Sequence, residues 1–323
     1  MKVDREKIWI LLDDRAGNRS QVIGVAKCLN RPTESKNLIY NPLAKLPNFI
    51  TPKTFATLNI RSRRNFVPPW PALVIGAGRR TGPIARQIKK LSAGETRIVQ
   101  IMDPGGDTKD FDLICVPKHD GHVKGSNVFQ INGAPHSLTP EVLNASREKW
   151  ISRFSHLKTP RIAVIVGGST RRRQFTNAMA TKLGSAASAM AQNTGGSLLI
   201  TTSRRSSNIE NTLINSITAQ NKFFRWGGSE ENPYLGYIAC ADIIIVTGES
   251  ISMCTEACAS TVPVYLFAPS KLLSSKHQRF HKYLIEGGYA QYLEDIGKLK
   301  APRHPALNPS SEIAEMIRNI MAW

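Results

Sequence analysis

Residues 239–267 read ACADIIIVTGESISMCTEACASTVPVYLF, and this stretch decides the fold. Ile243 to Val246 is an unbroken apolar, β-branched run, which is typical of a strand buried on both faces. A polar turn, a segment of helical spacing and a second buried-strand pattern over 262–267 follow. The stretch therefore predicts a strand–helix–strand unit of a parallel α/β sheet.

The turn before this helix is a candidate anion site. Ser250 and Ser252 open the predicted helix, where unpaired backbone N–H groups and the positive end of the helix dipole attract phosphate. Glu256 lies about one turn further and is placed to accept hydrogen bonds from a ribose diol. The alternative is an ordinary β–α–β unit in which Ser250 is an N-cap and Glu256 is solvated.

The chain has 323 residues, which is too long for a typical single core and suits two domains. Strands alternate with helices twice along the sequence, so we expect two doubly wound parallel sheets, with ligand at the carboxyl ends of their strands in a cleft between them. The segment 157–160 has the composition of a linker. We place an N-terminal domain over 1–155, a C-terminal domain over 160–305 and a final helix over 308–323.

The formal net charge is +19, which favours an acidic partner such as nucleic acid, anionic lipid or a phosphorylated ligand. Aromatic residues make up only 7%, and no basic cluster is interleaved with aromatic side chains. Nucleic acid is therefore the weakest of the three partners. An anionic membrane surface stays possible as a partner, and nothing in the sequence predicts an oligomeric state.

The five cysteines form no CxxC motif, which fits a reduced compartment. No run of about 18 apolar residues predicts a membrane span, and the first residues lack the pattern of a signal peptide. We expect a cytoplasmic protein whose membrane contact would be peripheral, at the inner face. No HExxH, Cys/His cluster or paired-carboxylate spacing predicts a metal site, so we expect neither a metal nor another resident cofactor.

Several motifs occur in one order along the chain and together carry a family resemblance. They are Asp13…Gly17-Asn18…Gln21, Gly76-Ala77-Gly78-Arg79-Arg80, Pro117…His119-Asp120, Asn127-Val128…Gly133-Ala134, Gly167-Gly168-Ser169, Thr201-Thr202-Ser203-Arg204-Arg205, Asn232-Pro233-Tyr234, and Ala241 to Ala257. Over nearly the whole chain they resemble the mitochondrial fission ELM family. The usual Thr-Asp-Ser of that family is replaced here by Thr247-Gly248-Glu249-Ser250.

That family is similar to GT-B glycosyltransferases and to nucleotide-sugar 2-epimerases. The resemblance implies two Rossmann-like domains, a nucleotide held by the C-terminal one, and a last helix that crosses back onto the N-terminal domain. Its plant members act in mitochondrial fission by recruiting a dynamin-related protein to the outer membrane.

In a GT-B site, helix N-termini and arginines stabilise the leaving nucleoside diphosphate without a metal. The residues that match this role end strands or open helices in the second half of the chain. They are Gly167, Gly168, Ser169, Ser203, Arg204, Arg205, Ser250, Ser252 and Glu256. Arginine suits bidentate phosphate contact better than lysine does. Arg171 to Arg173 lie beside the glycine turn, although a solvated loop explains them equally well.

An inverting transfer also needs a general base near the acceptor. The candidates are Asp13 and Asp14 at the end of the first strand, and His119 with Asp120 after a later one. Adjacent residues on an extended chain point apart, so an ordinary loop histidine explains His119 equally well. Other residues that we expect near the ligand are Gly17, Gln21, Gly78, Arg79, Arg80, Asn232 and Tyr234.

Three functions stay open at this point. The leading one is a metal-independent, GT-B-like glycosyltransferase that uses a nucleotide-sugar donor, most simply a UDP-sugar, and a membrane-associated acceptor. The second is a nucleotide-sugar epimerase or hydrolase on the same fold, and the third is a non-catalytic, membrane-peripheral adaptor. Arg204, Arg205 and Glu256 favour a working nucleotide site over the adaptor.

Overall fold

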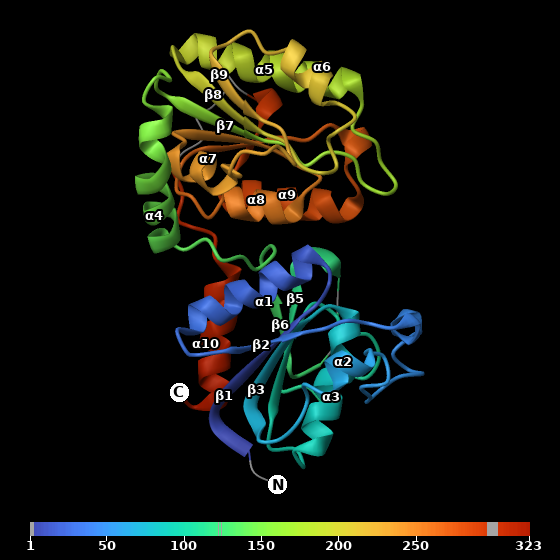
Figure 1. The fold of residues 1–323 in the computed structure, drawn as a ribbon. Helices are drawn as coiled ribbons and strands as arrows, with labels where there is room; N and C mark the ends of the chain where they lie inside the picture. Colours follow the sequence, from blue (N-terminus) through green and yellow to red (C-terminus); the bar gives the residue numbers. More distant parts are fainter. Residues whose placement is uncertain (1–2, 122, 124, 296–302) are drawn as a thin grey trace. The chain divides into compact units, whose positions relative to one another are not determined.

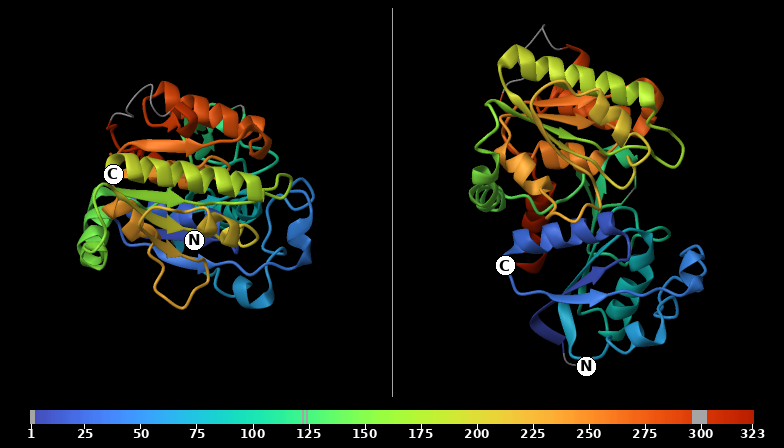
Figure 2. Two further views of the ribbon diagram at one scale, coloured as in Figure 1. Left: turned by 90° about the horizontal axis from the view of Figure 1, so that it is seen from above. Right: turned by 45° about the horizontal axis from the view of Figure 1, so that its top comes forward.

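The computed structural model describes residues 3–121, 123, 125–295 and 303–323. The chain divides into two compact units (Figure 1): unit 1 comprises Met1–Ser137 and Asn308–Trp323, and unit 2 comprises Leu138–Leu307. Each unit contains a six-stranded sheet whose strands are all parallel. Helices cover both faces of each sheet (Figure 2), which confirms the predicted α/β class.

The sheet of unit 1 has the strand order β2-β1-β3-β4-β5-β6. Its strands are β1 (Val3–Leu12), β2 (Glu34–Asn37), β3 (Trp70–Ala77), β4 (Arg97–Ile101), β5 (Leu113–Pro117) and β6 (Val128–Ile131). Its α-helices are α1 (Ala16–Leu29), α2 (Ile60–Arg63), α3 (Gly82–Leu91) and α10 (Pro309–Met321), and its short 3-10 turns are η1 (Pro42–Lys45), η2 (Arg79–Thr81) and η3 (Lys118–Asp120).

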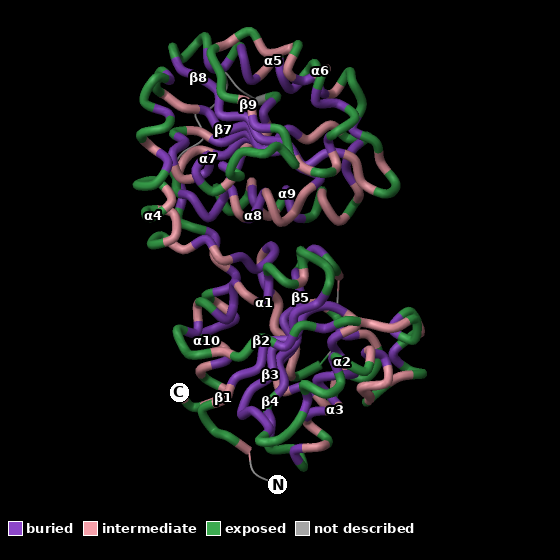
Figure 3. The backbone as a smooth tube through the Cα atoms, viewed as in Figure 1, coloured by how far each residue is buried: buried purple, intermediate pink, exposed green. Residues whose placement is uncertain are grey.

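The last helix returns to unit 1, as predicted. Ile313 and Ile317 of α10 join Val22 and Val25 of α1 in one apolar cluster against the sheet. The other face of the sheet carries α3, with Ile84 and neighbouring apolar residues packed on it. The strands between these layers form the buried centre of the unit (Figure 3), and every residue of β3 is buried, as its apolar sequence requires.

The sheet of unit 2 has the strand order β12-β11-β10-β7-β8-β9. Its strands are β7 (Arg161–Ile165), β8 (Ser197–Thr201), β9 (Asn221–Phe224), β10 (Ile243–Thr247), β11 (Val264–Phe267) and β12 (Gln291–Tyr292). Its helices are α4 (Pro140–Trp150), α5 (Asn177–Thr194), α6 (Glu210–Asn215), α7 (Tyr234–Cys240), α8 (Ile251–Ala257) and α9 (Ser275–Glu286), with the short turns η4 (Ile151–Phe154), η5 (Ser270–Leu272) and η6 (Leu293–Asp295). The decisive stretch is thus β10–α8–β11.

Each sheet reverses its winding beside its first strand. In unit 1 the chain runs from β1 to β2 on one side and reaches β3 on the other side of β1. In unit 2 it runs from β7 to β8 on one side and reaches β10 on the other. At such a switch point the loops after two adjacent strands diverge, and the crevice between them is where open α/β sheets bind ligands.

The boundary between the units lies earlier than the predicted residue 155. Helix α4 was expected in the first domain, but its Trp150 and the following Phe154 pack in the core of unit 2. Phe154 meets Tyr237 edge-on, with ring centroids 5.4 Å apart. A Cβ on Gly236 would come within 2.4 Å of the Trp150 ring, so α4 and α7 pack too closely to belong to different units. None of the described helices is long and apolar enough to cross a membrane.

Candidate functional site

The loops after β7, β8 and β10 meet at the carboxyl edge of the unit 2 sheet. The Gly167 N–H donates to Thr247 Oγ1 over 2.8 Å, which joins the loops after β7 and β10. The Ser169 N–H donates to the Arg205 carbonyl over 2.9 Å, which joins the loops after β7 and β8. These bonds bring Arg205 Nη2 to 3.6 Å from Glu249 Oε1 at the switch point of the sheet.

Glu249 is the buried charged group of this edge. Its side chain has no exposed surface, Oε1 lies 3.3 Å from Thr247 Oγ1, and Oε2 has no hydrogen-bond partner among the described residues. Burial raises the pKa of Glu249 to about 7, although the positive charge of Arg205 works in the opposite direction. The carboxyl therefore changes its protonation state near neutral pH, where a carboxyl at the surface would be fully ionised.

The two glycines after β7 are required by this arrangement. A Cβ on Gly167 would lie 2.0 Å from Glu249 Oε1. Gly168 has a φ of +106°, and a Cβ there would lie 2.4 Å from the Arg205 carbonyl oxygen. The approaching atoms are those of the protein, so a contact from either glycine to a ligand stays a proposal.

The serine hydroxyls predicted to bind phosphate divide into two groups. Ser169 Oγ accepts from the Phe175 N–H over 3.0 Å, and Ser203 Oγ donates to the Gly167 carbonyl, so both organise the loops. Ser250 is the N-cap residue of α8, but its side chain makes no capping hydrogen bond. Ser250 and Ser252 are half-buried at the start of a seven-residue helix, whose short length limits the dipole that it offers to an anion.

Arg205 and His277 contact Glu249, and further basic side chains lie in the neighbouring loops of this edge. A hollow of about 780 Å³ is lined by polar and basic residues that include Arg171, Arg172, Arg173, Lys271, Ser274 and His277. Arg204 is exposed, and Arg205 is half-buried. Burial, together with the charges of Lys276, Arg173 and Arg205, lowers the pKa of His277, whose ring hydrogen-bonds to the backbone of Glu249. Cations therefore outnumber the single carboxyl here, as an anionic ligand requires.

Glu256 has a partner that the sequence did not predict. The hydroxyl of Tyr234 donates to Glu256 Oε2, and burial raises the pKa of both groups. The side chain of Asn232 in turn accepts from the Tyr234 N–H over 3.0 Å. The structure thus joins Asn232, Tyr234 and Glu256, which the sequence placed near one ligand. Glu256 is half-buried and hydrogen-bonded, so the interpretation of it as a solvated residue is wrong.

A second group of predicted residues meets at the switch point of unit 1. Asp13 follows β1, is buried, and accepts from Asn18 Nδ2 over 2.7 Å and from Arg80 Nη2 over 2.5 Å. Asp14 is exposed, and both of its oxygens bind the Arg80 guanidinium. Burial, then the hydrogen bond with Asp14, raises the pKa of Asp13, whereas Arg80 holds the pKa of Asp14 low. Two carboxyls with diverging pKa values form a typical acid–base pair.

We expected the two arginines after β3 near a ligand, but both of their guanidinium groups are bound by other groups of the protein. The Arg80 guanidinium is bound by Asp13 and Asp14 and lies over the Tyr40 ring, 4.3 Å from its centroid. Arg79 turns the other way and donates to the carbonyls of Ala44 and Leu46 over 3.0 Å and 2.5 Å. The preceding Gly78 has a φ of +75°, and a Cβ there would lie 2.5 Å from Asn18 Nδ2.

The remaining predicted residues lie apart from Asp13. His119 is buried and Asp120 is exposed in η3 after β5. Strands β3 and β4 lie between β5 and β1. This turn is therefore three strand spacings, about 14 Å in all, from the end of β1. Gly17 lies in the exposed first turn of α1, which begins at Ala16, and no other atom would lie within 4 Å of a Cβ placed on it. Gln21 is buried in α1, and its Oε1 has no hydrogen-bond partner among the described residues.

Sequence reasoning missed three residues of the unit 2 edge: Glu249, Lys271 and His277. A signal for Glu249 was present, because it is the residue by which this chain departs from the Thr-Asp-Ser pattern. His277 belongs to a basic cluster over 276–282 that carried no assigned role. Among the described residues, no group of three or more His, Cys, Asp or Glu side chains is placed to hold a metal ion.

The model of one protein family, described as mitochondrial fission ELM1, matches residues 16–321. An uncharacterised protein of Rickettsia prowazekii, RP120, is 31% identical to the chain and aligns over 96% of this chain and 97% of its own length. The mitochondrial fission protein ELM1 of Arabidopsis thaliana is 27% identical, over 81% of this chain and 66% of its own length.

Solved structures of the same fold include a UDP-GlcNAc 2-epimerase and MurG. The UDP-GlcNAc 2-epimerase of Methanocaldococcus jannaschii superposes with a TM-score of 0.58 at 11% identity, covering 98% of this chain and 99% of that one. MurG of Acinetobacter baumannii superposes with a TM-score of 0.53 at 14% identity, covering 97% and 99%. At such identity the likeness shows the fold alone, which is that of the GT-B enzymes.

Proposed function

The chain belongs to the mitochondrial fission ELM1 family, and on that premise we propose that it is a GT-B-type glycosyltransferase that takes its sugar from a nucleotide-sugar, most simply a UDP-sugar. Unit 2 binds this donor in the proposal, and no metal takes part. The observation that carries the proposal is the excess of basic side chains in the loops at the switch point of the unit 2 sheet, where Arg205 faces the buried carboxyl of Glu249. A solved neighbour, the archaeal 2-epimerase, is described as a complex with UDP-GlcNAc and UDP, which supports this choice of donor.

The leaving group of such a transfer is a nucleoside diphosphate, and its charge must be stabilised as the glycosidic bond breaks. Arg205 suits this task because, among the described residues, its guanidinium is held only by contacts of 3.5 Å and 3.6 Å, longer than a strong charge-assisted bond. It can therefore turn to a diphosphate at small cost. Arg204 and the three arginines 171–173 add positive charge from the neighbouring loops.

Glu249 would oppose an anion in its ionised form. With a pKa of about 7 it can take up a proton near neutral pH, which removes the repulsion and supplies an O–H donor for a phosphate oxygen. In this proposal Tyr234 and Glu256 bind the ribose. One oxygen of Glu256 is oriented by the tyrosine hydroxyl, and the other can accept a hydrogen bond from the diol.

The base of the proposed reaction is assigned to the carboxylate pair of unit 1. Asp13 has the raised pKa and is the stronger base, whereas Asp14 is the exposed member that an acceptor hydroxyl can reach. Asp13→Asn and Asp14→Asn separate these roles: loss of turnover with unchanged donor affinity is expected from the variant that removes the base.

The first test is the thermal stability of the protein with UDP, GDP, CMP, ADP and their sugar conjugates. A ligand at 100 times its Kd stabilises the native state by about 2.7 kcal/mol and raises the Tm by a few degrees. Arg205→Ala should abolish the shift. Arg153→Ala is the matched control, because Arg153 stacks on Trp150 and is bound to Glu231, outside the site.

A shift with one nucleotide that Arg205→Ala removes and Arg153→Ala retains would support the donor site and name its base. Proton NMR of the incubated nucleotide-sugar then distinguishes transfer, which releases nucleoside diphosphate only with an acceptor, from epimerisation, which leaves the nucleotide-sugar intact but inverted at one carbon. No shift with any of these nucleotides at millimolar concentration would refute the proposal and favour the adaptor.

A further inference from the structure

A segment of unit 1 that the proposed reaction does not use carries most of the exposed apolar surface. We call this segment, residues 38–67 between β2 and β3, the basic arm; Figure 1 shows it projecting from one side of unit 1. Of the eight large apolar side chains that are exposed in the described part of the chain, six belong to the basic arm. They are Ile39, Leu43, Phe49, Ile50, Ile60 and Val67.

The charge of the basic arm has one sign. It contains Lys45, Lys53, Arg61, Arg63 and Arg64, all exposed. It contains no carboxylate, and in the sequence no Asp or Glu occurs between Glu34 and Glu95. A second run without Asp or Glu, between Glu148 and Glu210, is as long and also basic. None of the exposed large apolar side chains of the described residues lies in it, so the combination of exposed apolar and purely basic side chains is particular to the arm.

The arm has an apolar interior of its own, so the exposed apolar side chains are not needed to fold it. Phe55 stacks on Phe66 with ring centroids 4.9 Å apart, and Phe66 meets the fully buried Trp9 of the sheet at 5.9 Å. The backbone of the arm folds back on itself, because the Asn59 N–H donates to the Ile39 carbonyl over 2.9 Å and Tyr40 pairs with Leu58.

The tip of the arm, which carries Phe49 and Ile50, is held on one side by the turn after β3. Asn48 is buried and donates to the carbonyls of Arg79 and Pro104 over 2.8 Å and 2.6 Å. Arg79 donates back to the carbonyls of Ala44 and Leu46. The backbone immediately before Phe49 is therefore fixed to the body of unit 1.

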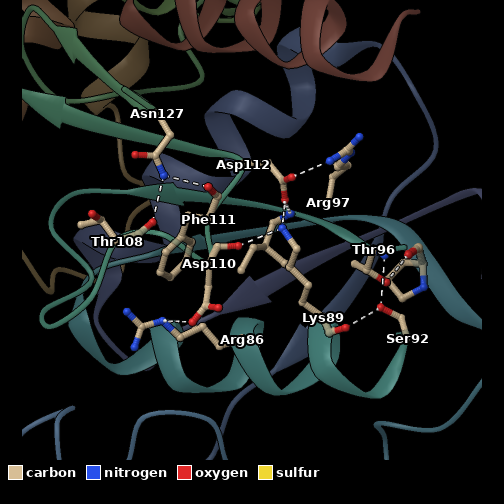
Figure 4. Close-up of polar contacts among 12 residues, drawn as sticks. Arg86, Lys89, Ser92, Thr96, Arg97, Thr108, Asp110, Phe111, Asp112 and Asn127 are labelled. Carbon is tan, nitrogen blue, oxygen red and sulfur yellow. Dashed lines mark hydrogen bonds and ion pairs between the residues drawn. The ribbon is translucent and has the colours of Figure 1, made fainter. Parts of the chain in front are cut away.

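The tip is also held on its other side, through Asp110. Lys53 Nζ lies 2.9 Å from Asp110 Oδ1, and Arg86 Nε lies 3.6 Å from Asp110 Oδ2. Figure 4 shows Arg86 on α3 directed at Asp110, beside the bonds that tie Asp112 and Asn127 into the same network. Between these two anchors Phe49 and Ile50 are 77% and 54% exposed. The anchors hold the backbone of the tip in place, so these side chains are presented to solvent by a fixed structure.

We propose that the basic arm is a membrane-docking surface that binds the anionic face of a lipid bilayer. Phe49 and Ile50 enter the boundary between headgroups and acyl chains, where apolar side chains gain from leaving water. Lys45, Arg61 and Arg64 contact lipid phosphates, and each cation near an anionic surface adds to the affinity. An apolar tip among cations matches a surface that is anionic outside and apolar inside, and the absence of carboxylates from the arm removes the repulsion that such a surface would otherwise exert.

The test is co-sedimentation of the full chain with vesicles of phosphatidylcholine alone and with 30% phosphatidylglycerol. Binding is expected to the anionic vesicles and to weaken as salt is raised. The double variant Phe49→Ser/Ile50→Ser should lower the partition coefficient at least tenfold. The matched control is Trp226→Ser, which removes a 51% exposed aromatic side chain from unit 2 and should bind as the unchanged protein does.

Charge is tested separately with Arg61→Gln/Arg64→Gln against Arg5→Gln/Lys90→Gln, in which two exposed cations outside the arm are removed. Only the first pair should lower binding, by about tenfold. Since all the substituted side chains are exposed, every variant should keep the Tm of the unchanged protein. Hydrogen exchange of the unchanged protein on vesicles gives a second measurement that needs no variant, with protection expected over 42–56.

The proposal fails if the anionic vesicles bind no protein, in which case a protein partner would be the occupant left to the arm. It fails equally if the arm variants bind as well as their controls, or if protection from exchange lies outside the arm. None of these results bears on the donor site, because nucleotide binding is measured on unit 2 without vesicles.

Discussion

The switch points of the two sheets contain the same kinds of residue, but the ratio of carboxyl groups to cations is reversed between them. Each has a buried carboxyl, an arginine that faces it and a glycine with positive φ. In unit 1 two carboxylates, Asp13 and Asp14, share the single guanidinium of Arg80. In unit 2 a single carboxyl, Glu249, faces Arg205 and bonds through its backbone to His277, and further arginines and a lysine line the hollow beside His277.

The contacts between arginine and carboxyl also differ between the two units, and they are shorter where carboxylates are in excess. Arg80 Nη2 lies 2.5 Å from Asp13, and Asp14 binds both Nη1 and Nη2, so two carboxylates close this side of the guanidinium to an anion, while Nε has no hydrogen-bond partner among the described residues. Arg205 Nη2 lies 3.6 Å from Glu249, and the carboxyl still has an oxygen without a partner. The same edge of one fold thus carries two carboxylates on one arginine in unit 1 and one carboxyl among several cations in unit 2, which our proposal assigns to proton transfer and to anion binding.

The glycines give the largest effect expected from a single substitution. Gly168→Ala should lower the free energy of unfolding by about 4 kcal/mol, because its positive φ strains an alanine and its Cβ would strike the Arg205 carbonyl. Gly78→Ala should cost about 2 kcal/mol, because its Cβ meets the movable amide of Asn18. Gly17→Ala is the control: nothing lies within 4 Å, and alanine should stabilise the helix by about 0.5 kcal/mol. Urea unfolding measures all three, and equal costs at 17 and 168 would contradict the tight junction of the unit 2 loops.

Removing the arginine of unit 1 comes next in size. Arg80→Ala leaves Asp13 buried without its main cationic partner, and we expect a loss of about 3 kcal/mol at pH 7. Protonation of the stranded carboxyl relieves the penalty, so the loss should shrink as the pH falls toward 4. Arg80→Ala/Asp13→Asn is the matched control, since it removes the charge together with its partner. If the single and double variants unfold at the same urea concentration, Arg80 and Asp13 do not form the closed pair described here.

Much of the fold follows from the sequence because it is encoded by long, regular patterns. The buried strands Ile243–Thr247 and Trp70–Ala77 are apolar runs bounded by glycine or polar turns, and their alternation with helices leaves a parallel sheet as the simple solution. The two short edge strands β2 and β12 escaped prediction, since ESKN and QY carry no apolar pattern and pair only through neighbours distant in sequence. The membership of α4 in unit 2 was not predicted for a similar reason, because the contacts of Trp150 that show it are tertiary.

The site was less predictable, because its chemistry depends on which way side chains turn. Arg79 and Arg80 are adjacent and identical in sequence terms, yet one holds the basic arm and the other holds two carboxylates. Serines 169 and 203 read as phosphate ligands, but their hydroxyls complete the loops that carry them. Glu249 was visible only as an irregularity of one motif, and its burial, which gives it a chemical role, results from three loops that meet in space.

The carboxyl of unit 2 predicts a pH dependence of intermediate size. The pKa of Glu249 is raised by burial to about 7, above its value in the unfolded chain, so the folded state holds the extra proton between about pH 4.5 and 7. Stability from this group is therefore complete below that range and is lost as the pH rises through it, by on the order of 3 kcal/mol. Glu249→Gln should remove this slope and be the more stable protein at pH 8 while matching the unchanged one at pH 4.5. A parallel pair of stability curves would mean that Glu249 is ionised throughout.

The smallest effect is expected from replacing Arg205, the arginine of unit 2 that corresponds to Arg80 of unit 1. The Arg205 side chain is 36% exposed and lies 3.6 Å from its partner, so solvent screens the pair and Arg205→Ala should cost only about 1 kcal/mol at pH 6. Its charge still lowers the pKa of Glu249, so the variant should shift the pH window of the preceding prediction upward. Arg205→Lys keeps the charge and should keep the window while losing the bidentate contact to a diphosphate. A cost for Arg205→Ala as large as that for Arg80→Ala would mean that the unit 2 cluster is closed like that of unit 1, and the argument for an anion site there would lose its basis.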